Sequence, residues 1–256
     1  LLLSAALIFS QDANALGNPV KISTSSNDVA NPATVADSKG YLHVVWQEMN
    51  PGQVVFLGQN PGIFYSRWNG DTWSTPLKIS ANTDLAVNPS ISVDSNDTIH
   101  VAWGDNTYGN CADGNPPPCN PGSSLPTVAY KTRTSAGVWS AISQLPIPAG
   151  QLATRIPKIA INTANEPNVF FDATDVYHDS IYWTRFTAGA WTTPQLISQN
   201  EAGGNITDAQ WTDVKDDDAG NIHIVYWSWT QSLHYRKLTN NAFTTPFKVN
   251  TSGNME

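Results

Sequence analysis

Charge is the scarcest feature of this sequence: Asp, Glu, Lys and Arg make up 13% of its 256 residues, about half the usual share. The charges present are mainly acidic, with 13 Lys and Arg against 21 Asp and Glu, which gives a net charge of −8. We therefore expect no nucleic-acid partner and no polybasic contact with an anionic membrane. Hydrophobic residues still reach 40% and include ten Trp, which argues against a disordered chain.

Cysteine is also scarce, and the two that occur, Cys111 and Cys119, lie close together in the segment CADGNPPPC. In an exported protein such a pair most simply forms a disulfide that closes a loop. Two cysteines with no nearby His make a poor zinc site, so we expect no structural metal there.

Long apolar runs are missing except at the N-terminus, where LLLSAALIFS is too short to span a bilayer. The run resembles the apolar part of a secretory signal, and Ala13-Asn14-Ala15 fits the cleavage pattern before Leu16. The sequence thus predicts a partial signal peptide over residues 1–15 and a protein that is secreted or held at the cell surface. A buried strand is the alternative interpretation of this run.

What the sequence has in plenty is repetition. The segment PATVADSKGYLHVVW at 32–46 matches the segments at 89–103 and 157–171 and, with one insertion, the segment at 211–226. Each consists of an alternating run, a polar turn and a second alternating run, which is the pattern of a β-hairpin. A second strand–turn–strand block follows each hairpin, at 63–80, 127–145, 181–198 and 233–250.

Four short strands per unit, repeated at this period, predict an all-β fold: a β-propeller of four-stranded antiparallel blades. The expected propeller domain covers residues 16–256. Its four complete blades are expected at about 30–80, 87–145, 155–198 and 209–250. One aromatic position recurs in every unit, as Trp73, Trp139, Trp191 and Phe243.

The segment LGNPVKIS at 16–23 matches the fourth strand of a blade, as in PLKIS at 76–80. It predicts an orphan N-terminal strand without a blade of its own. We expect this sequence to be truncated at both ends and to come from a full protein of six or seven blades. A four-bladed ring with a spare strand is the alternative.

The length variation falls between the second and third strands of the blades, at 47–62, 104–126 and 172–180. All these loops lie on one face of a propeller, so that face is the expected binding site. On it lie residues that depart from the repeat: Arg155, His178 and three tryptophans, Trp211, Trp227 and Trp229. An exposed indole can stack on the C–H face of a sugar, although blade packing is the alternative role.

The turn SRWNGDTW at 66–73 resembles the Asp-box, or BNR repeat, S-x-D-x-G-x-T-W of the sialidase (neuraminidase) superfamily. It keeps the Ser, Gly, Thr and Trp of that pattern and lacks the Asp, and the other three turns are more degenerate. The resemblance implies the propeller fold more than an activity.

A second resemblance is Arg155-Ile156-Pro157, similar to the (F/Y)-R-I-P motif of sialidases, whose Arg binds the carboxylate of sialic acid. It implies that Arg155 is a carboxylate ligand and that Asp175 or Asp179, with Asp172 on the same loop, supplies the acid/base. The motif departs from the family: Thr154 replaces the aromatic residue, and it enters the third blade instead of the first. No evident Tyr–Glu pair supplies the nucleophile.

Calcium is a weaker prediction. The segment KDDDAGN at 215–221 lacks the spacing of an EF-hand loop, so we interpret it as a solvated turn. Asp105, Asn106 and Asp113 are a second candidate set, and we expect neither a cofactor nor a metal.

Three functional hypotheses follow. The first is non-catalytic recognition of glycans or surface proteins by the loop-rich face, with stacking from Trp211, Trp227 and Trp229 and polar contacts from Arg155, Asp172 and His178. The second is an exo-sialidase or related glycoside hydrolase that uses Arg155, Asp175 and Asp179. The third is a structural propeller of a larger surface protein.

Overall fold

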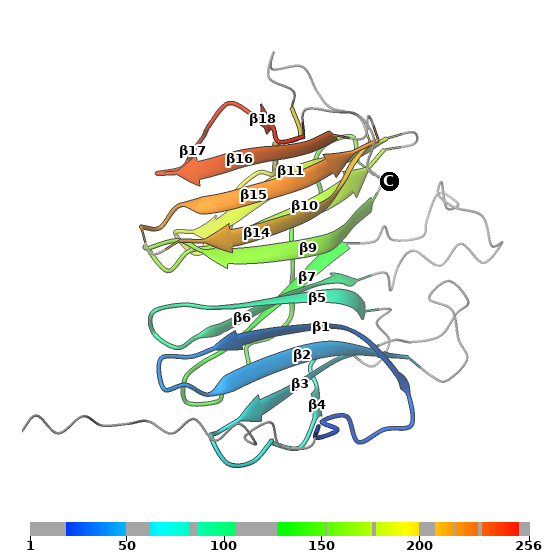
Figure 1. Cartoon of the computed structure of the whole chain (residues 1–256), viewed down its shortest axis with the longest axis vertical. Coiled ribbons are helices and arrows are strands. Elements are labelled where there is room, and N and C mark those ends of the chain that lie inside the picture. Colours follow the sequence, from blue (N-terminus) through cyan, green and yellow to red (C-terminus); the bar gives the residue numbers. More distant parts are fainter. Residues whose placement is uncertain are drawn as a thin grey trace, which may run out of the picture.

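The structure is a computed structural model of the whole chain (Figure 1). It describes residues 19–49, 62–81, 86–105, 127–151, 153–175, 178–199, 208–217, 219–229 and 232–250. The predicted signal segment, Cys111, Cys119, Asn106 and Asp113 lie outside the described residues, so the predictions made on them stay predictions.

Four antiparallel sheets follow one another along the chain, each in the order of its strands. The first contains β1 (Asp28–Ala36), β2 (Leu42–Met49), β3 (Gly62–Trp68) and β4 (Leu77–Lys78). The second contains β5 (Ala86–Val93), β6 (Ile99–Asp105), β7 (Thr127–Arg133) and β8 (Ser143–Gln144).

In the third and fourth sheets the outermost position is divided into two short pieces. The third contains β9 (Ala153–Ile161), β10 (Pro167–Thr174) and β11 (Asp179–Thr187), with β12 (Ala190–Trp191) and β13 (Gln195–Leu196) paired to β11. The fourth contains β14 (Ala209–Asp216), β15 (Ile222–Ser228) and β16 (Ser232–Thr239), with β17 (Ala242–Phe243) and β18 (Phe247–Lys248) paired to β16. The predicted architecture of four-stranded blades is confirmed, and the described residues contain no helix that could span a membrane.

The first strands of the four blades are the inner strands, and each packs against the next: β1 on β5, β5 on β9 and β9 on β14. The blue first sheet and the orange-red fourth sheet lie at opposite ends of this series (Figure 1). Over the described residues the blades therefore form an open series and do not close into a ring.

Three apolar layers hold the blades together, one at each junction. Because side chains alternate along a strand, Val101 and Trp103 of β6 pack against the first blade, while Ala102 between them packs against the third. Every inner junction thus buries both facing sheets, which no single blade could achieve alone.

The recurring aromatic position is explained by these junctions. Trp139 meets Tyr65 of the preceding blade edge-on, with ring centroids 5.0 Å apart and an interplanar angle of 86°. The same T-shaped contact recurs between Trp191 and Tyr130 and between Phe243 and Trp183. Edge-to-face geometry is the favoured one for such pairs, so each blade is held to its neighbour by one repeated aromatic contact.

The expected orphan strand at 16–23 has a different outcome in its described part. Residues 19–24 form no strand. Instead Val20 and Ile22 lie beside Val44 and Trp46 of β2, with which they line a small cavity. β4 forms a strand because it pairs with β3, the third strand of its blade. Residues 19–24 lie against the face of the first sheet and not at its edge, so they do not pair in this way.

Candidate functional site

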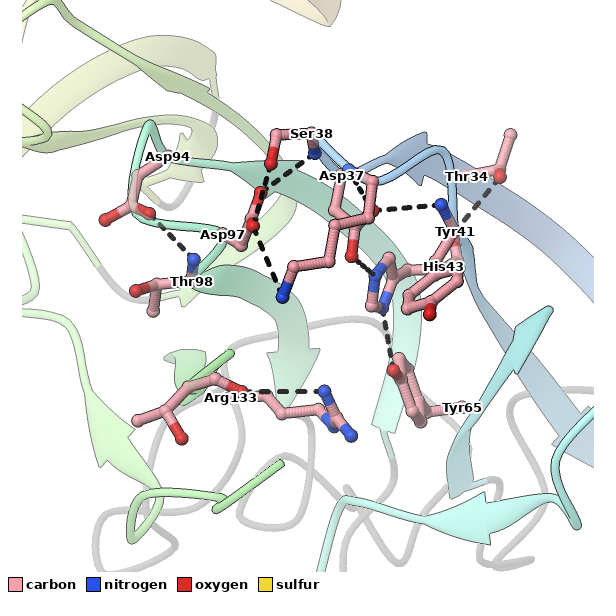
Figure 2. A network of polar contacts seen from close by, with 12 residues as sticks. Thr34, Asp37, Ser38, Tyr41, His43, Tyr65, Asp94, Asp97, Thr98 and Arg133 are labelled. Carbon is pink, nitrogen blue, oxygen red and sulfur yellow. Dashed lines mark hydrogen bonds and ion pairs between the residues drawn. The ribbon is translucent and has the colours of Figure 1, made fainter. Parts of the chain in front are cut away.

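The two ends of the inner strands differ in chemistry. At the end that carries the turn between the first two strands of a blade, each of three blades holds a buried or half-buried Asp–His–Tyr set. In the first blade, His43 Nδ1 lies 2.7 Å from the Tyr65 hydroxyl and Nε2 lies 3.3 Å from Asp37 (Figure 2). The equivalent sets are Asp94–His100–Tyr130 and Asp217–His223–Tyr235.

Burial decides the protonation of this set. It lowers the pKa of His43 and raises the pKa of Tyr65 to about 12. Burial alone would also raise the pKa of Asp37, but hydrogen bonds from the Tyr41 amide and from His43 bring it below its ordinary value. At neutral pH the set is a neutral imidazole between a carboxylate and a protonated phenol. A phenol this hard to ionise is a poor nucleophile, so the set is framework.

Neighbouring turns at this end are also bonded to each other. The backbone amide and the hydroxyl of Ser38 donate to the two carboxylate oxygens of Asp97 on the next turn, at 2.8 and 2.9 Å (Figure 2). Ser95 repeats the contact with Asn165, at 3.0 and 2.9 Å. A cavity of about 160 Å³ near Glu166 also lies at this end. That carboxylate is already engaged by Thr187, Asn162 and Arg185, which makes the cavity a poor candidate for ligand recognition.

At the opposite end each inner strand has a bulge, where the register with the second strand shifts. The bulge residues all have positive φ: Asn31 (51°), Asn88 (52°), Ile156 (50°) and Trp211 (54°). Proline follows in the first three blades and Thr212 in the fourth. The Ile-Pro of Arg155-Ile156-Pro157 is thus the local form of a bulge that every blade has, and only the Arg is particular to the third blade.

All four bulges contribute to one cavity of about 390 Å³ that runs along the inner strands, and we call it the axial cavity. Its lining includes all four bulge residues, together with Ser90 and Lys158. Proteins place ligands in concave sites of this order of size that combine apolar walls with a few polar groups. This axial cavity is the candidate site.

An amide network fixes one side of the axial cavity. Asn31 Nδ2 donates to Asn88 Oδ1 at 2.7 Å and to Gln47 Oε1 at 3.2 Å. The same Gln47 oxygen accepts the backbone N–H of Asn88 at 3.1 Å. Gln47 is 2% exposed, so a buried amide from β2 holds the bulges of two blades in register.

The three predicted tryptophans come together at the other side of the cavity. Trp211 and Trp227 stack with centroids 5.6 Å apart and planes at 24°, and Trp227 and Trp229 are 5.5 Å apart. Trp211 is 67% exposed and Trp229 64%. Trp211 lines the cavity, and Trp229 is placed by its backbone N–H, which donates to the Asp208 carbonyl. We call these three residues the Trp row.

The other predicted residues are divided between two environments. Asp172 is fully buried and lies opposite Arg155 in the ladder of β9 and β10, which places Arg155 by its backbone. Asp179 is 8% exposed and accepts a hydrogen bond from Gln210 Nε2. Asp175 and His178 instead form an exposed pair in which the Asp175 carboxylate accepts the His178 amide at 2.8 Å.

Sequence reasoning missed four polar residues at this site: Asn31, Asn88, Gln47 and Gln210. The signal for two of them was present, since Asn-Pro occurs at the same place in the first and second blades. Gln210 occupies in β14 the ladder position that Arg155 has in β9, just before the bulge.

The glutamates of the described residues do not form the Tyr–Glu pair that sialidase chemistry needs. Glu48 is 2% exposed and accepts hydrogen bonds from Ser25, Asn27 and the Trp46 indole. Glu166 lies at the turn end, away from the axial cavity. In the described part of the chain, both carboxylates are therefore framework groups.

Searches against protein-family models and against curated proteins found no match to the chain. Solved structures do match. A protein of unknown function from Dyadobacter fermentans shares 12% identity at a TM-score of 0.65, over 87% of this chain and 69% of that one. The NanB sialidase of Streptococcus pneumoniae shares 12% identity at a TM-score of 0.61, over 91% of this chain and 54% of that one.

A polysaccharide lyase of the ulvan lyase family PL25 also matches, with 14% identity and a TM-score of 0.58, over 87% of this chain and 55% of the lyase. The fold is that of a sialidase-like propeller. The chain spans about half the length of these two enzymes, and identities this low show a common fold alone.

Proposed function

We propose that this sialidase-like propeller is an exported or cell-surface glycan-binding protein whose binding site is the axial cavity together with the Trp row. The observation that carries the proposal is the exposure of the row: Trp211 and Trp229 are 67% and 64% exposed, and Trp211 lines the cavity. Single exposed aromatic side chains need no explanation, but a cluster of them marks an interaction site.

The chemistry of the site suits a sugar. An indole offers a flat apolar face for the C–H side of a pyranose, and the amides of Asn31 and Asn88 offer hydrogen-bond partners for its hydroxyl groups. The named neighbours support a carbohydrate ligand, because they are a sialidase and a lyase bound to a GlcA–Rha3S saccharide.

Backbone conformation points to the same residues. Positive φ is well tolerated by the Asn of the first two bulges, but Ile156 and Trp211 adopt it at a cost. Costly backbone conformations cluster at binding sites, where the side chain is needed for another purpose. The two blades that break the Asn pattern are also those that carry Arg155, which directly precedes the bulge in the third blade, and Trp211, which lines the cavity in the fourth.

A sialidase-type hydrolase is the second candidate, favoured by the position of Arg155 opposite the buried Asp172 and beside the bulge that lines the cavity. The absence of a Tyr–Glu pair from the described residues disfavours it. Arg155→Ala separates the two: it abolishes turnover of a sialoside if the protein is a hydrolase, whereas a binding protein that relies on the Trp row keeps most of its affinity.

The experiment is glycan-array binding by the folded protein, with Trp229→Ala as the test variant and Phe247→Ala as the matched control. Phe247 is another exposed aromatic residue of the same blade, 59% exposed on β18 at the outer edge. We expect Trp229→Ala to abolish the signal and Phe247→Ala to keep it. A folded wild type that binds no glycan overturns the proposal and leaves a structural propeller.

A further inference from the structure

The fourth blade has an outer face built like the faces that the other blades bury. In the second and third blades the second strand, β6 or β10, is buried on both sides over nearly its whole length. β15 instead alternates between buried and half-buried residues. Its buried residues, such as Ile224, pack toward the third blade, so the residues between them, such as Val225, lie on the outer side. β16 alternates in the same way. We call the half-buried residues of the two strands the open face: His223, Val225, Trp227, Leu233, Tyr235 and Lys237.

The Asp–His–Tyr set of the fourth blade shows what the open face lacks. The side chains of His43 and His100 are 2% and 6% exposed, but that of the equivalent His223 is 40% exposed. The bonds within the set are still formed, since His223 Nδ1 lies 2.9 Å from the Tyr235 hydroxyl and Nε2 lies 3.1 Å from Asp217. The difference is the cover. A following blade packs against the first and second blades, and among the described residues no blade follows the fourth.

The cover that a following blade supplies is aromatic. Trp139 of the second blade lies edge-on to Tyr65 of the first, and the Arg133 guanidinium lies over the same ring, 5.5 Å from its centroid. The next two junctions repeat the edge-on contact. Tyr235 is the last member of this series, and among the described residues its ring contact is with His223 of its own blade. The open face therefore lacks an aromatic partner from another blade.

The first blade carries such a partner on its own outer face. Trp73 begins the recurring aromatic series that Trp139 continues. Trp68 pairs with Trp73 as Arg133 pairs with Trp139, so the first blade has an indole where the second has a guanidinium. The two indoles contact each other, with ring centroids 5.7 Å apart, and Leu42 on the same side is 39% exposed. The first and fourth blades thus end the series with complementary faces.

Hydrogen bonds across the junctions show the same match. Lys131 and Arg236, at one position of the second and fourth blades, donate to a carbonyl of the preceding blade at 3.1 and 2.9 Å. The first and third blades have Ser66 and Thr184 at this position, and both hydroxyl groups donate within their own blade. The first blade therefore has the pattern of the third, and it is suited to follow the fourth blade as the third follows the second.

The first blade of the same chain lies at the opposite end of the series and does not reach the open face (Figure 1). We propose that a second copy of this chain docks its first blade on the open face, with Trp73 edge-on to Tyr235 and Trp68 over the same ring. The docking displaces residues 19–24 from the first blade. Few contacts hold that segment, since Val20 is 71% exposed.

The symmetry of this contact predicts the product. A head-to-tail contact leaves a first-blade face on one copy and an open face on the other, so the assembly either closes into a ring or continues as a filament. Two copies supply eight blades, which is within the range of closed propellers. The expected product is a dimer with two equal contacts.

Gel filtration with light scattering and sedimentation velocity, over a range of concentrations, measure the association of the whole chain. We expect a dimer whose dissociation constant rises about tenfold or more in Tyr235→Ala and in Trp73→Ala, as for aromatic anchors of other interfaces. Val138→Ala is the control and should leave the constant unchanged, because Val138 is 64% exposed and lies on the second blade.

A mixture of the two variants tests the head-to-tail arrangement. A mixed dimer has one intact contact and one contact that lacks both rings. Because the two rings touch in the proposed contact, losing both costs little more than losing one, so the mixture should associate more tightly than either variant alone.

Two outcomes would overturn the proposal. One is the mass of a single chain at every concentration. The other is an association that Tyr235→Ala weakens and Trp73→Ala does not, which would show two fourth blades docked face to face. If Tyr235→Ala does not fold, Trp68→Ala and Trp73→Ala provide the test from the other face. None of these residues lines the axial cavity, so glycan binding by the variants reports separately on the proposed function.

Discussion

The two ends of the propeller axis are built on the same four inner strands, yet their side chains behave differently. At the turn end the side chains repeat from blade to blade. Some bond within their own blade, as His43 does to Tyr65, and others bond across a junction, as Ser38 does to Asp97. At the bulge end the backbone repeats just as closely, with φ between 50° and 54°, but the side chains change from Asn to Ile to Trp.

This difference indicates where packing controls residue type. A side chain that closes a junction must have a fixed size and hydrogen-bonding pattern, so every blade keeps nearly the same one. A side chain that faces the axial cavity is not enclosed in a junction, so its size is less constrained. In the proposed binding site its identity can serve a ligand, and the cost appears as strain at Ile156 and Trp211.

The test with the largest expected effect compares the stability of Tyr130→Ala, at the turn end, with that of Trp229→Ala, in the Trp row. Tyr130 is 7% exposed, bonds His100 at 2.6 Å and meets Trp191 edge-on, so its truncation should cost about 3–5 kcal/mol of unfolding free energy. Trp229 is 64% exposed, and its truncation should cost no more than about 0.5 kcal/mol. Urea unfolding measures both, and equal losses would show that the Trp row is also framework.

A second test compares two glycines of the turn end. Gly40 and Gly220 have φ of 77° and 78°, but a Cβ on Gly40 meets open space, whereas one on Gly220 lies 2.4 Å from Thr163 Cγ2. Gly40→Ala should cost about 1 kcal/mol from the backbone alone and Gly220→Ala about 2 kcal/mol. Adding Thr163→Ala should bring the second value back to the first. If it does not, the third junction is not closely packed at this turn.

The sequence allowed the fold to be predicted because each blade repeats the same alternation and the same aromatic position. Trp139 and Trp191 recur since each fills the same place against Tyr65 and Tyr130. The bulges could not be predicted in this way, because a register shift of this kind depends on the partner strand as well as on the residue itself.

The fold was predictable from residues that repeat, whereas part of the candidate site was predictable from residues that depart from the repeat. Trp211, Trp227 and Trp229 were found because they depart from the repeat. Asn31 and Asn88 were missed because they belong to the repeat, and sequence reasoning interprets repeated residues as framework. Gln47 was missed because a buried amide holding two bulges is visible only once the blades are side by side.

The third prediction concerns strain at the bulge end. Ile156 is a β-branched residue at φ 50°, where the first two blades have Asn. Ile156→Asn should therefore raise the unfolding free energy by about 1 kcal/mol while reducing glycan binding, because the side chain lines the cavity. Thermal unfolding and titration with the bound sugar check the two effects. A variant that is less stable than the wild type would show that Ile156 is placed by packing, like the residues of the turn end.

The smallest expected effect is a pH response of the turn end. Burial holds the pKa of folded His43 below its ordinary value of 6.5, against the opposing influence of Asp37 and with help from Arg67 and Arg133. Between that lowered pKa and 6.5 the unfolded chain binds a proton that the folded chain does not, so His43 makes stability fall as pH decreases below 6.5. Asp37, whose pKa is lowered from 3.8, contributes its own loss only at more acidic pH. The third blade has Asn168 at the equivalent place, so His43→Asn is the matched variant. Its melting temperature should change less between about pH 7 and pH 5 than that of the wild type, in melts at constant ionic strength. Parallel slopes would show that His43 takes up its proton as readily in the folded chain as in the unfolded chain, and that burial at the turn end does not exclude a charge.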